Sequence, residues 1–219
     1  MSHTVTIDVY SDVVCPWCYV GKRRLERALS QVKGDLNPHV TWRPFQLNPT
    51  MPLEGLDRID YLEAKFGSRE AFASVEERVV SAGEMEGIRF AFGKIKRTPN
   101  TFLAHRLIWH ARQLGREDAM VESLFKGYFE EGAEISSIAS LLPLADRAGV
   151  RADTVLSGGD GIVEVTAEQA VGHRLGIRGV PYFLIDDAYV LSGAQPPERL
   201  VAALRAAQSG AAQKVSPSK

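Results

Sequence analysis

Four short segments of the chain are rich in apolar, β-branched and aromatic residues, two near each end of the sequence. Apolar side chains at alternate or successive positions in such segments are typical of β-strands. Strands are therefore predicted over residues 4–10, 39–45, 180–185 and 189–192. Pro44 cannot donate a backbone hydrogen bond, so we expect the second strand to end at a sheet edge. Asp186 and Asp187 separate the last two strands as a turn, which predicts a hairpin.

Apolar residues at helical spacing mark most of the remaining chain. A first helix is predicted directly after residue 15, where Val20, Leu25 and Leu29 recur among lysines and arginines. Ser68 is a typical capping residue at the start of another helix. The same spacing predicts further helices over residues 58–66, 68–82, 100–114, 118–131, 137–148, 153–157, 161–175 and 197–207, whereas residues 90–93 are expected to be extended.

The predicted elements follow the order βαβ, then a long helical block, then αββα. These outer pieces are the parts of a thioredoxin-like α/β fold, in which a helix joins two parallel strands. The middle block is too long for a loop and must bury its own apolar faces. We therefore expect a discontinuous thioredoxin-like domain of residues 1–50 and 160–208. An all-helical subdomain of residues 51–159 is expected to be inserted between its halves, over the sheet edge near residue 15. Residues 209–219 are small and polar and are predicted to be disordered.

Composition narrows the class of protein. The 219 residues are 45% hydrophobic and 24% charged, with a formal net charge of −1, as in ordinary water-soluble globular proteins. No basic block or long apolar run stands out, so neither a nucleic acid nor a membrane is an expected partner. The first residues lead into a strand without the apolar segment of a secretory signal, which makes the cytoplasm the expected location.

Cys15-Pro16-Trp17-Cys18 holds the only two cysteines of the sequence, at the predicted junction of a strand and a helix. A cysteine at a helix N-terminus meets unpaired backbone N–H groups and the helix dipole, which favour its thiolate. The second cysteine, one turn further on, can attack a mixed disulfide formed by the first. Pro16 suits an early helical position, which needs no N–H. In a reducing compartment such a pair is more often catalytic than structural, so the motif predicts dithiol–disulfide exchange.

A structural zinc site is an alternative for two cysteines with this spacing. A closed zinc site needs four ligands, and the five histidines are scattered along the sequence without a partner motif. His105 and His110 are five positions apart, which suits one helix face poorly. We therefore expect no metal ion, and the sequence indicates no resident cofactor.

Several segments resemble the DsbA-type thioredoxin-fold oxidoreductases, and specifically their cytoplasmic FrnE-like branch. The active-site segment is residues 11–22, SDVVCPWCYVGK. Further stretches are similar to the same group: RPFQLNP at residues 43–49, AHRL at residues 104–107, and GVP at residues 179–181 with GAQ at residues 193–195. The resemblance extends over residues 5–204, and the segments are specific when taken together.

This resemblance implies a thiol–disulfide oxidoreductase with Cys15 as the nucleophile and Cys18 as the resolving thiol. It also implies that the bond between Val180 and Pro181 is cis and lies against the cysteines. A cis X–Pro bond persists only where the surrounding structure fixes it. The backbone of Val180 would then pair with an extended substrate, and Pro181 would shape the docking groove. The implied partners are protein or small-molecule thiols and disulfides.

The sequence departs from the family pattern in two ways. Periplasmic members carry a histidine between the cysteines, where this chain has Trp17, and an indole cannot supply the positive charge of an imidazolium. We therefore expect the Cys15–Cys18 pair to be less oxidising than that of a periplasmic oxidant. Some FrnE-like proteins also carry a second cysteine pair. This chain has none after Cys18, so no relay between two disulfides is expected.

Relatives with the same fold supply a second hypothesis, a glutathione-dependent isomerase or transferase. The kappa-class glutathione transferases and the hydroxychromene-carboxylate isomerases have serine where Cys15 stands, and they bind glutathione. A pocket for a small aromatic substrate would then lie between the sheet and the helical subdomain. Its candidate lining residues are Asn48, Asn100, His105 and Gln195. Cys18 favours the oxidoreductase, because an isomerase needs no second thiol.

Some of these residues have simpler structural explanations. His105 can be a polar residue that packs the helical subdomain, Gln195 can belong to a turn before a helix, and Asp12 can cap the helix after it.

A third hypothesis is a chaperone-like module that binds clients through an apolar groove. Glutathione remains a candidate co-substrate, and the exposed helices of the subdomain make a homodimer a candidate assembly.

Overall fold

A four-stranded mixed sheet organises the computed structural model, which describes residues 4–210. Its strands, in the spatial order β2-β1-β5-β6, are β2 Asn37–Pro44, β1 Thr4–Ser11, β5 Tyr182–Ile185 and β6 Tyr189–Ser192. Strands β1 and β2 are parallel, whereas β1 pairs antiparallel with β5 and β5 antiparallel with β6. The predicted edge position of Pro44 is confirmed. The turn residues Asp186 and Asp187 have positive φ angles of 48° and 52°, as in tight hairpin turns.

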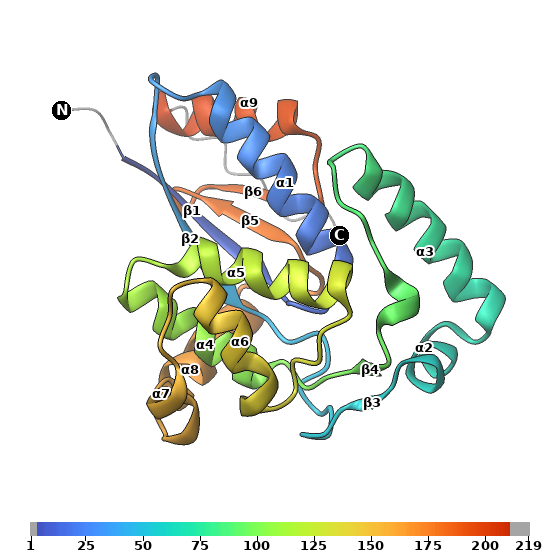
Figure 1. Ribbon diagram of the computed structural model, residues 1–219. Coiled ribbons are helices and arrows are strands. Elements are labelled where there is room, and N and C mark those ends of the chain that lie inside the picture. Colours follow the sequence, from blue (N-terminus) through green and yellow to red (C-terminus); the bar gives the residue numbers. More distant parts are fainter. Residues whose placement is uncertain (1–3, 211–219) are drawn as a thin grey trace.

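Helices cover both faces of this sheet (Figure 1). The alternation of β1 sends Val5, Ile7 and Val9 into the main core, which they share with apolar residues of α1 Pro16–Gln31 and α9 Pro197–Gln208. Tyr10 joins a smaller apolar cluster. There α8 Ile162–Arg174 comes so close that a side chain on Gly172 would lie 3.1 Å from the Tyr10 ring. Residues of β1 that point to opposite faces therefore pack against different helices, one set on each side of the sheet.

The segment between β2 and α8 is mainly helical. Its helices are α2 Arg58–Phe66, α3 Arg69–Glu84, α4 Phe102–Gln113, α5 Glu117–Lys126, α6 Ile138–Arg147 and α7 Asp153–Ser157. Ser68 caps α3 by accepting a hydrogen bond from Ala71 N, as predicted. The segment also holds a two-stranded sheet of β3 Leu56–Asp57 and β4 Arg97–Thr98, which the sequence does not reveal because each strand has only two residues.

We call α2 and α3 together the α2–α3 arm. Figure 1 shows it at one side of the molecule, away from the central sheet. Helix α2 contains no buried residue, and α3 buries only its inner face, including Phe72 and Val79. The main core, by contrast, runs without a break from the sheet into the helical segment, joining Ile7 to Leu107 and Phe125. The division into a 1–50/160–208 domain and a 51–159 subdomain therefore stays a prediction.

The order βαβ, helical block, αββα is confirmed, and apart from the small β3–β4 sheet within the block the differences lie at element ends. The helix predicted over residues 118–131 changes at Gly127 into a wider π-helical turn, Gly127–Glu131, in which Leu144 packs directly against the glycine. The stretch predicted as extended ends in a 3₁₀ turn, Phe92–Lys94. Most of the predicted disordered tail, residues 211–219, lies outside the described residues. Over residues 4–210, no helix has both the length and the apolar content to cross a bilayer.

Candidate active site

The two cysteines lie where β1 passes into α1. Cys15 occupies the N-cap position with an extended backbone (φ −92°, ψ 109°), and Pro16 begins the helix. The N–H of Cys15 donates to the carbonyl of Asp12 at 3.0 Å, which closes the connecting turn. Both thiols are free. Cys15 therefore lies at the positive end of the α1 dipole.

The two thiols differ in exposure. Cys15 is 5% exposed, whereas Cys18 is completely buried, in contact with the Cys15 thiol. Burial raises the pKa of Cys18 well above its ordinary range, and the Cys15 thiol adds to the effect, although the Ser11 hydroxyl and the Asp12 backbone oppose it. Near neutral pH, Cys18 is therefore a protonated thiol. The arrangement separates a reachable sulfur from a protected one.

A cis peptide bond joins Val180 to Pro181 beside the cysteines. The Cys15 thiol donates to the carbonyl of Val180 at 3.5 Å, so the loop touches the sulfur directly. Gly21 permits this approach, because a Cβ at that position would lie 2.9 Å from Pro181 Cγ. On its other side the loop is held by Gly193, whose N–H donates to the Pro181 carbonyl at 2.8 Å. The GVP and GAQ segments of the sequence thus form one structural unit with α1.

A cavity of about 210 Å³ opens beside Cys15, under the α2–α3 arm. One side of its wall is Cys15, Pro16 and Trp17, together with Leu47 and Asn48 after β2. The arm and the segments packed against it supply the rest of the wall, which is mainly aromatic and aliphatic: Arg58, Tyr61, Leu62, Lys65, Phe66, Phe72, Val75, Glu76, Val79, Phe92, Thr98, Tyr128 and Phe129. Cys15 therefore forms part of the wall of this cavity.

Of the four predicted pocket residues, Asn48 lines the cavity and the other three do not. Asn48 Oδ1 accepts a hydrogen bond from the Tyr61 hydroxyl at 2.9 Å. Asn100 instead accepts from the N–H of Phe102 at the start of α4 and donates to a backbone carbonyl of the preceding loop. Gln195 braces the loop before α9, donating to the Ser192 carbonyl. Both side chains are engaged by neighbouring backbone groups and side chains and do not line this cavity, so the pocket prediction is wrong for them.

His105 is buried in α4 and does not line the cavity; its Nε2 faces Asp12 Oδ1 at 3.3 Å. The geometry is not that of a hydrogen bond, and neither atom has a hydrogen-bond partner among residues 4–210. The other Asp12 oxygen accepts from Leu47 N at 2.7 Å. Asp12 therefore ties the loop after β2 to the cysteine loop, and the expectation that it caps α1 is wrong.

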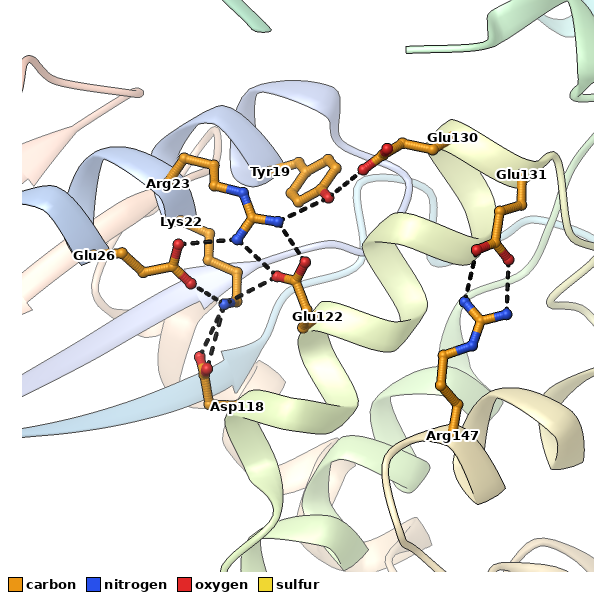
Figure 2. A network of polar contacts seen from close by, with 9 residues as sticks. All are labelled: Tyr19, Lys22, Arg23, Glu26, Asp118, Glu122, Glu130, Glu131 and Arg147. Atoms are coloured by element: carbon orange, nitrogen blue, oxygen red, sulfur yellow. Dashed lines mark hydrogen bonds and ion pairs between the residues drawn. The ribbon is translucent and has the colours of Figure 1, made fainter. Parts of the chain in front are cut away.

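Figure 2 shows the charged network that fixes α1 against α5. Lys22 is 1% exposed, and its ammonium group contacts Glu26 on the same helix and both Asp118 and Glu122 of α5. Arg23 pairs with the same Glu122. Although burial alone would raise the pKa of Glu122, the cations of Arg23 and Lys22 lower it, so this carboxyl stays charged.

Tyr19 extends this network toward the cavity. Its hydroxyl accepts from Arg23 at 3.0 Å and donates to Glu130 at 2.6 Å, next to Phe129 in the cavity wall (Figure 2). The sequence does not reveal that α5 packs against α1, or that the arm shares a cavity wall with Cys15. Helical periodicity shows which side of each helix is buried, but not which partner buries it. Within residues 4–210, no three side chains of the kinds that bind metals gather into a metal site.

Solved structures share this fold. A probable DsbA oxidoreductase from Streptomyces coelicolor is 32% identical with a TM-score of 0.86, covering 98% of this chain and 93% of that one. A 2-hydroxychromene-2-carboxylate isomerase is 16% identical with a TM-score of 0.71, covering 94% and 98%. The cytosolic disulfide reductase DsbM from Pseudomonas aeruginosa, solved with GSH (glutathione), is 19% identical with a TM-score of 0.60, covering 94% and 96%. The last two likenesses show the fold alone.

The sequence itself matches a family model along most of its length. The model is that of the DSBA-like thioredoxin domain, and it matches residues 6–205, which include both cysteines, the helical segment and the cis-proline loop. The chain therefore belongs to the DSBA-like thioredoxin domain family.

Proposed function

We propose that this protein is a thiol–disulfide oxidoreductase that works through Cys15-Pro16-Trp17-Cys18. The observation that carries the proposal is the placement of the two thiols. Cys15 lies at the N-terminus of α1, in the wall of a cavity, and Cys18 is buried beside it. This placement supports Cys15 as the nucleophile and Cys18 as the resolving thiol.

The reaction proceeds in two exchange steps. The Cys15 thiolate attacks one sulfur of a substrate disulfide, forms a mixed disulfide and releases the other half of the substrate as a thiolate, which takes up a proton. Cys18 then loses its proton and attacks the Cys15 sulfur, which releases the second half as a thiol. Two electrons pass to the substrate, and Cys15 and Cys18 form a disulfide. The reverse sequence oxidises a dithiol, and the relative potentials decide the direction.

Val180 and Pro181 are proposed to guide the substrate. Their cis bond lies against Cys15, and the Val180 carbonyl accepts from its thiol, so the loop borders the sulfur that reacts. An extended disulfide-bearing chain that reaches Cys15 can pair with the backbone of Val180.

Glutathione is the proposed reductant. Two molecules of this thiol return a Cys15–Cys18 disulfide to the dithiol and leave as glutathione disulfide, which balances the cycle. The likeness to DsbM, solved with GSH, supports thiol exchange of this kind. Cys18 argues against an isomerase, which requires no resolving thiol. We keep the cytoplasm as the proposed location and the FrnE-like branch as the proposed group.

Two single substitutions test this function. Cys15→Ser should abolish reduction of insulin and of small disulfides, because no other thiol of the chain can replace it. Cys18→Ser should instead accumulate a mixed disulfide on Cys15. Intact-mass spectrometry reads this result directly, since the variant has one cysteine and forms at most one adduct per chain.

Ser30→Cys in a Cys15→Ser/Cys18→Ser background serves as the control, because it places one thiol on α1 away from the cavity. It should form adducts far more slowly than Cys18→Ser. Loss of turnover in Cys18→Ser without any trapped adduct would contradict the assigned roles.

A further inference from the structure

The wall of the cavity beside Cys15 offers few free polar groups. Arg58 is paired with Glu76 and lies over the Phe92 ring, with its guanidinium carbon 5.1 Å from the ring centre. The Tyr128 hydroxyl donates to the Arg97 carbonyl at 3.2 Å. These groups bind one another, so the surface they leave toward the cavity is mainly aromatic and aliphatic.

Three other polar side chains of the wall, those of Lys65, Tyr61 and Asn48, are likewise hydrogen-bonded to one another. The Lys65 ammonium donates to the Tyr61 hydroxyl at 3.1 Å, and that hydroxyl donates to Asn48 Oδ1 at 2.9 Å. Thr98 adds a buried hydroxyl that has no hydrogen-bond partner among the described residues. Because most polar groups of the wall are already paired, a strongly polar ligand would find few partners to replace its lost hydration, whereas an apolar group needs none.

The volume of the cavity also limits which groups it can hold. An apolar cavity of about 150 Å³ is large enough for a benzene molecule, and this cavity measures about 210 Å³. One aromatic ring, or a compact two-ring group, fits it. A glutathione tripeptide carries two carboxylates and an ammonium group, for which this mainly aromatic and aliphatic wall offers few partners. Because Cys15 is only 5% exposed, a compact disulfide reaches this recessed sulfur more readily than a folded polypeptide does.

We propose that the cavity is a specificity subsite for a small-molecule disulfide, holding an aromatic or bulky apolar group attached to the sulfur that Cys15 attacks. This inference rests on the proposed function and names its substrate class. The Cys15 thiolate bonds to the sulfur that carries the apolar group and displaces the other half of the disulfide as a thiolate. Cys18 then displaces the apolar thiol from Cys15. Two electrons pass from the cysteines to the substrate.

One unsymmetrical disulfide tests the proposal. In 2-phenylethyl 2-hydroxyethyl disulfide both leaving groups are alkyl thiols, and only one half is aromatic. The Cys18→Ser variant retains whichever half it attacks, and intact mass identifies the adduct. We expect the phenylethyl adduct to exceed the hydroxyethyl adduct by about tenfold or more, as burial of one aromatic group allows. The same disulfide treated with N-acetylcysteine gives the ratio without protein.

Substitutions in the cavity wall test whether the preference for the phenylethyl half arises there. Val75→Trp, combined with Cys18→Ser, fills the cavity from α3 and should bring the adduct ratio down to the value without protein. Ser74→Trp adds the same ring to an exposed neighbour on α3 and should keep the ratio. Thr98→Val removes the unpaired hydroxyl at nearly constant volume and should leave the ratio unchanged or higher. A fall in Thr98→Val would overturn the assignment of this wall to an apolar group.

The outcomes separate this inference from the function on which it rests. No adduct of either kind would contradict the oxidoreductase function itself. Adducts in the ratio found without protein would overturn the aromatic subsite and leave the function intact, whether or not Val75→Trp folds. Insulin reduction that Val75→Trp lowers as strongly as the phenylethyl preference would assign the cavity to polypeptides and overturn the small-molecule assignment.

Discussion

Cys18 is the side chain whose surroundings most directly control the proposed reaction. It is completely buried, and burial raises the pKa of its thiol. Only the thiolate attacks, so each resolution step begins with the loss of a proton that the protein interior holds tightly. The neighbouring Cys15 has the opposite placement, at a helix N-terminus and in a cavity wall. One tetrapeptide thus creates two different sulfur environments.

A pH dependence of resolution follows from this burial. When Cys15 carries a small thiol as a mixed disulfide, release of that thiol by Cys18 should accelerate steadily from about pH 6 to about pH 9, because the thiolate fraction of Cys18 rises while its raised pKa stays above this range. Rapid acid quenching followed by intact-mass analysis measures the rate. A rate that is level across this interval would show that Cys18 is already ionised.

The residues that could be predicted from sequence are those whose chemistry is local. The roles of Cys15 and Cys18 follow from a short motif, whereas the cis bond at Pro181 is implied by the family resemblance, and the structure has that bond cis and against Cys15. Asn100 could not be assigned in this way, because its amide donates to the carbonyl of Met51, which only the folded chain brings near. Gln195 donates to the carbonyl of Ser192, only three residues earlier, in agreement with the turn explanation for this residue.

At the scale of elements, the charged network between α1 and α5 fixes the cysteine helix against the helical segment. Lys22 carries the central charge and is almost fully buried, with three carboxylates around it. A buried charge is tolerated when it is well paired, and removal of one partner is costly. The short strands β3 and β4 and the contact of α5 with α1 depend on such long-range pairing, whereas the long helices follow from their own periodicity.

Glu122→Gln tests the network. The substitution removes one charged partner each from Arg23 and Lys22, while Glu26 still contacts both cations and Asp118 still contacts Lys22. We expect the free energy of unfolding to fall by about 1.5–3 kcal/mol, the usual contribution of hydrogen bonds to charged groups. Urea unfolding at neutral pH measures it. Glu77→Gln, at an exposed site on α3, is the matched control and should change stability by less than about 0.5 kcal/mol. If the two substitutions lowered the free energy of unfolding equally, the network would have no special role in stability.

At the scale of the whole molecule, several glutamates make stability depend on acid. Hydrogen bonds from Arg147 to Glu131 and from the backbone to Glu70 lower the pKa of each carboxyl. Glu86 and Glu122 also have lowered pKa values, because neighbouring arginines outweigh the effect of burial. Burial raises the pKa of Glu117, which acts in the opposite direction. More of these glutamates have a lowered pKa than a raised one, so the folded state binds fewer protons than the unfolded chain in mild acid.

The sign of the pH effect follows directly. A carboxyl with a lowered folded pKa stabilises the fold above its unfolded pKa, about 4.3 for glutamate, and this contribution is lost as the pH falls through the folded pKa. We therefore expect the free energy of unfolding to decrease as the pH is lowered from about 5 to about 3. Urea titrations across this interval test it, and Glu122→Gln should show a shallower decrease. A stability that rises in acid would mean that Glu117 and groups like it dominate.

The α2–α3 arm gives the molecule a further property. It supplies much of the cavity wall, yet the two cysteines and the cis-proline loop belong to other segments. Since α2 contributes no buried residue, its side chains can change with little effect on the core. Much of the wall that would contact a substrate under the proposed function therefore lies outside the segments that carry the cysteines and the cis-proline loop. Substitutions among the wall residues of α2 should then change which disulfides react while the redox centre and the core stay the same.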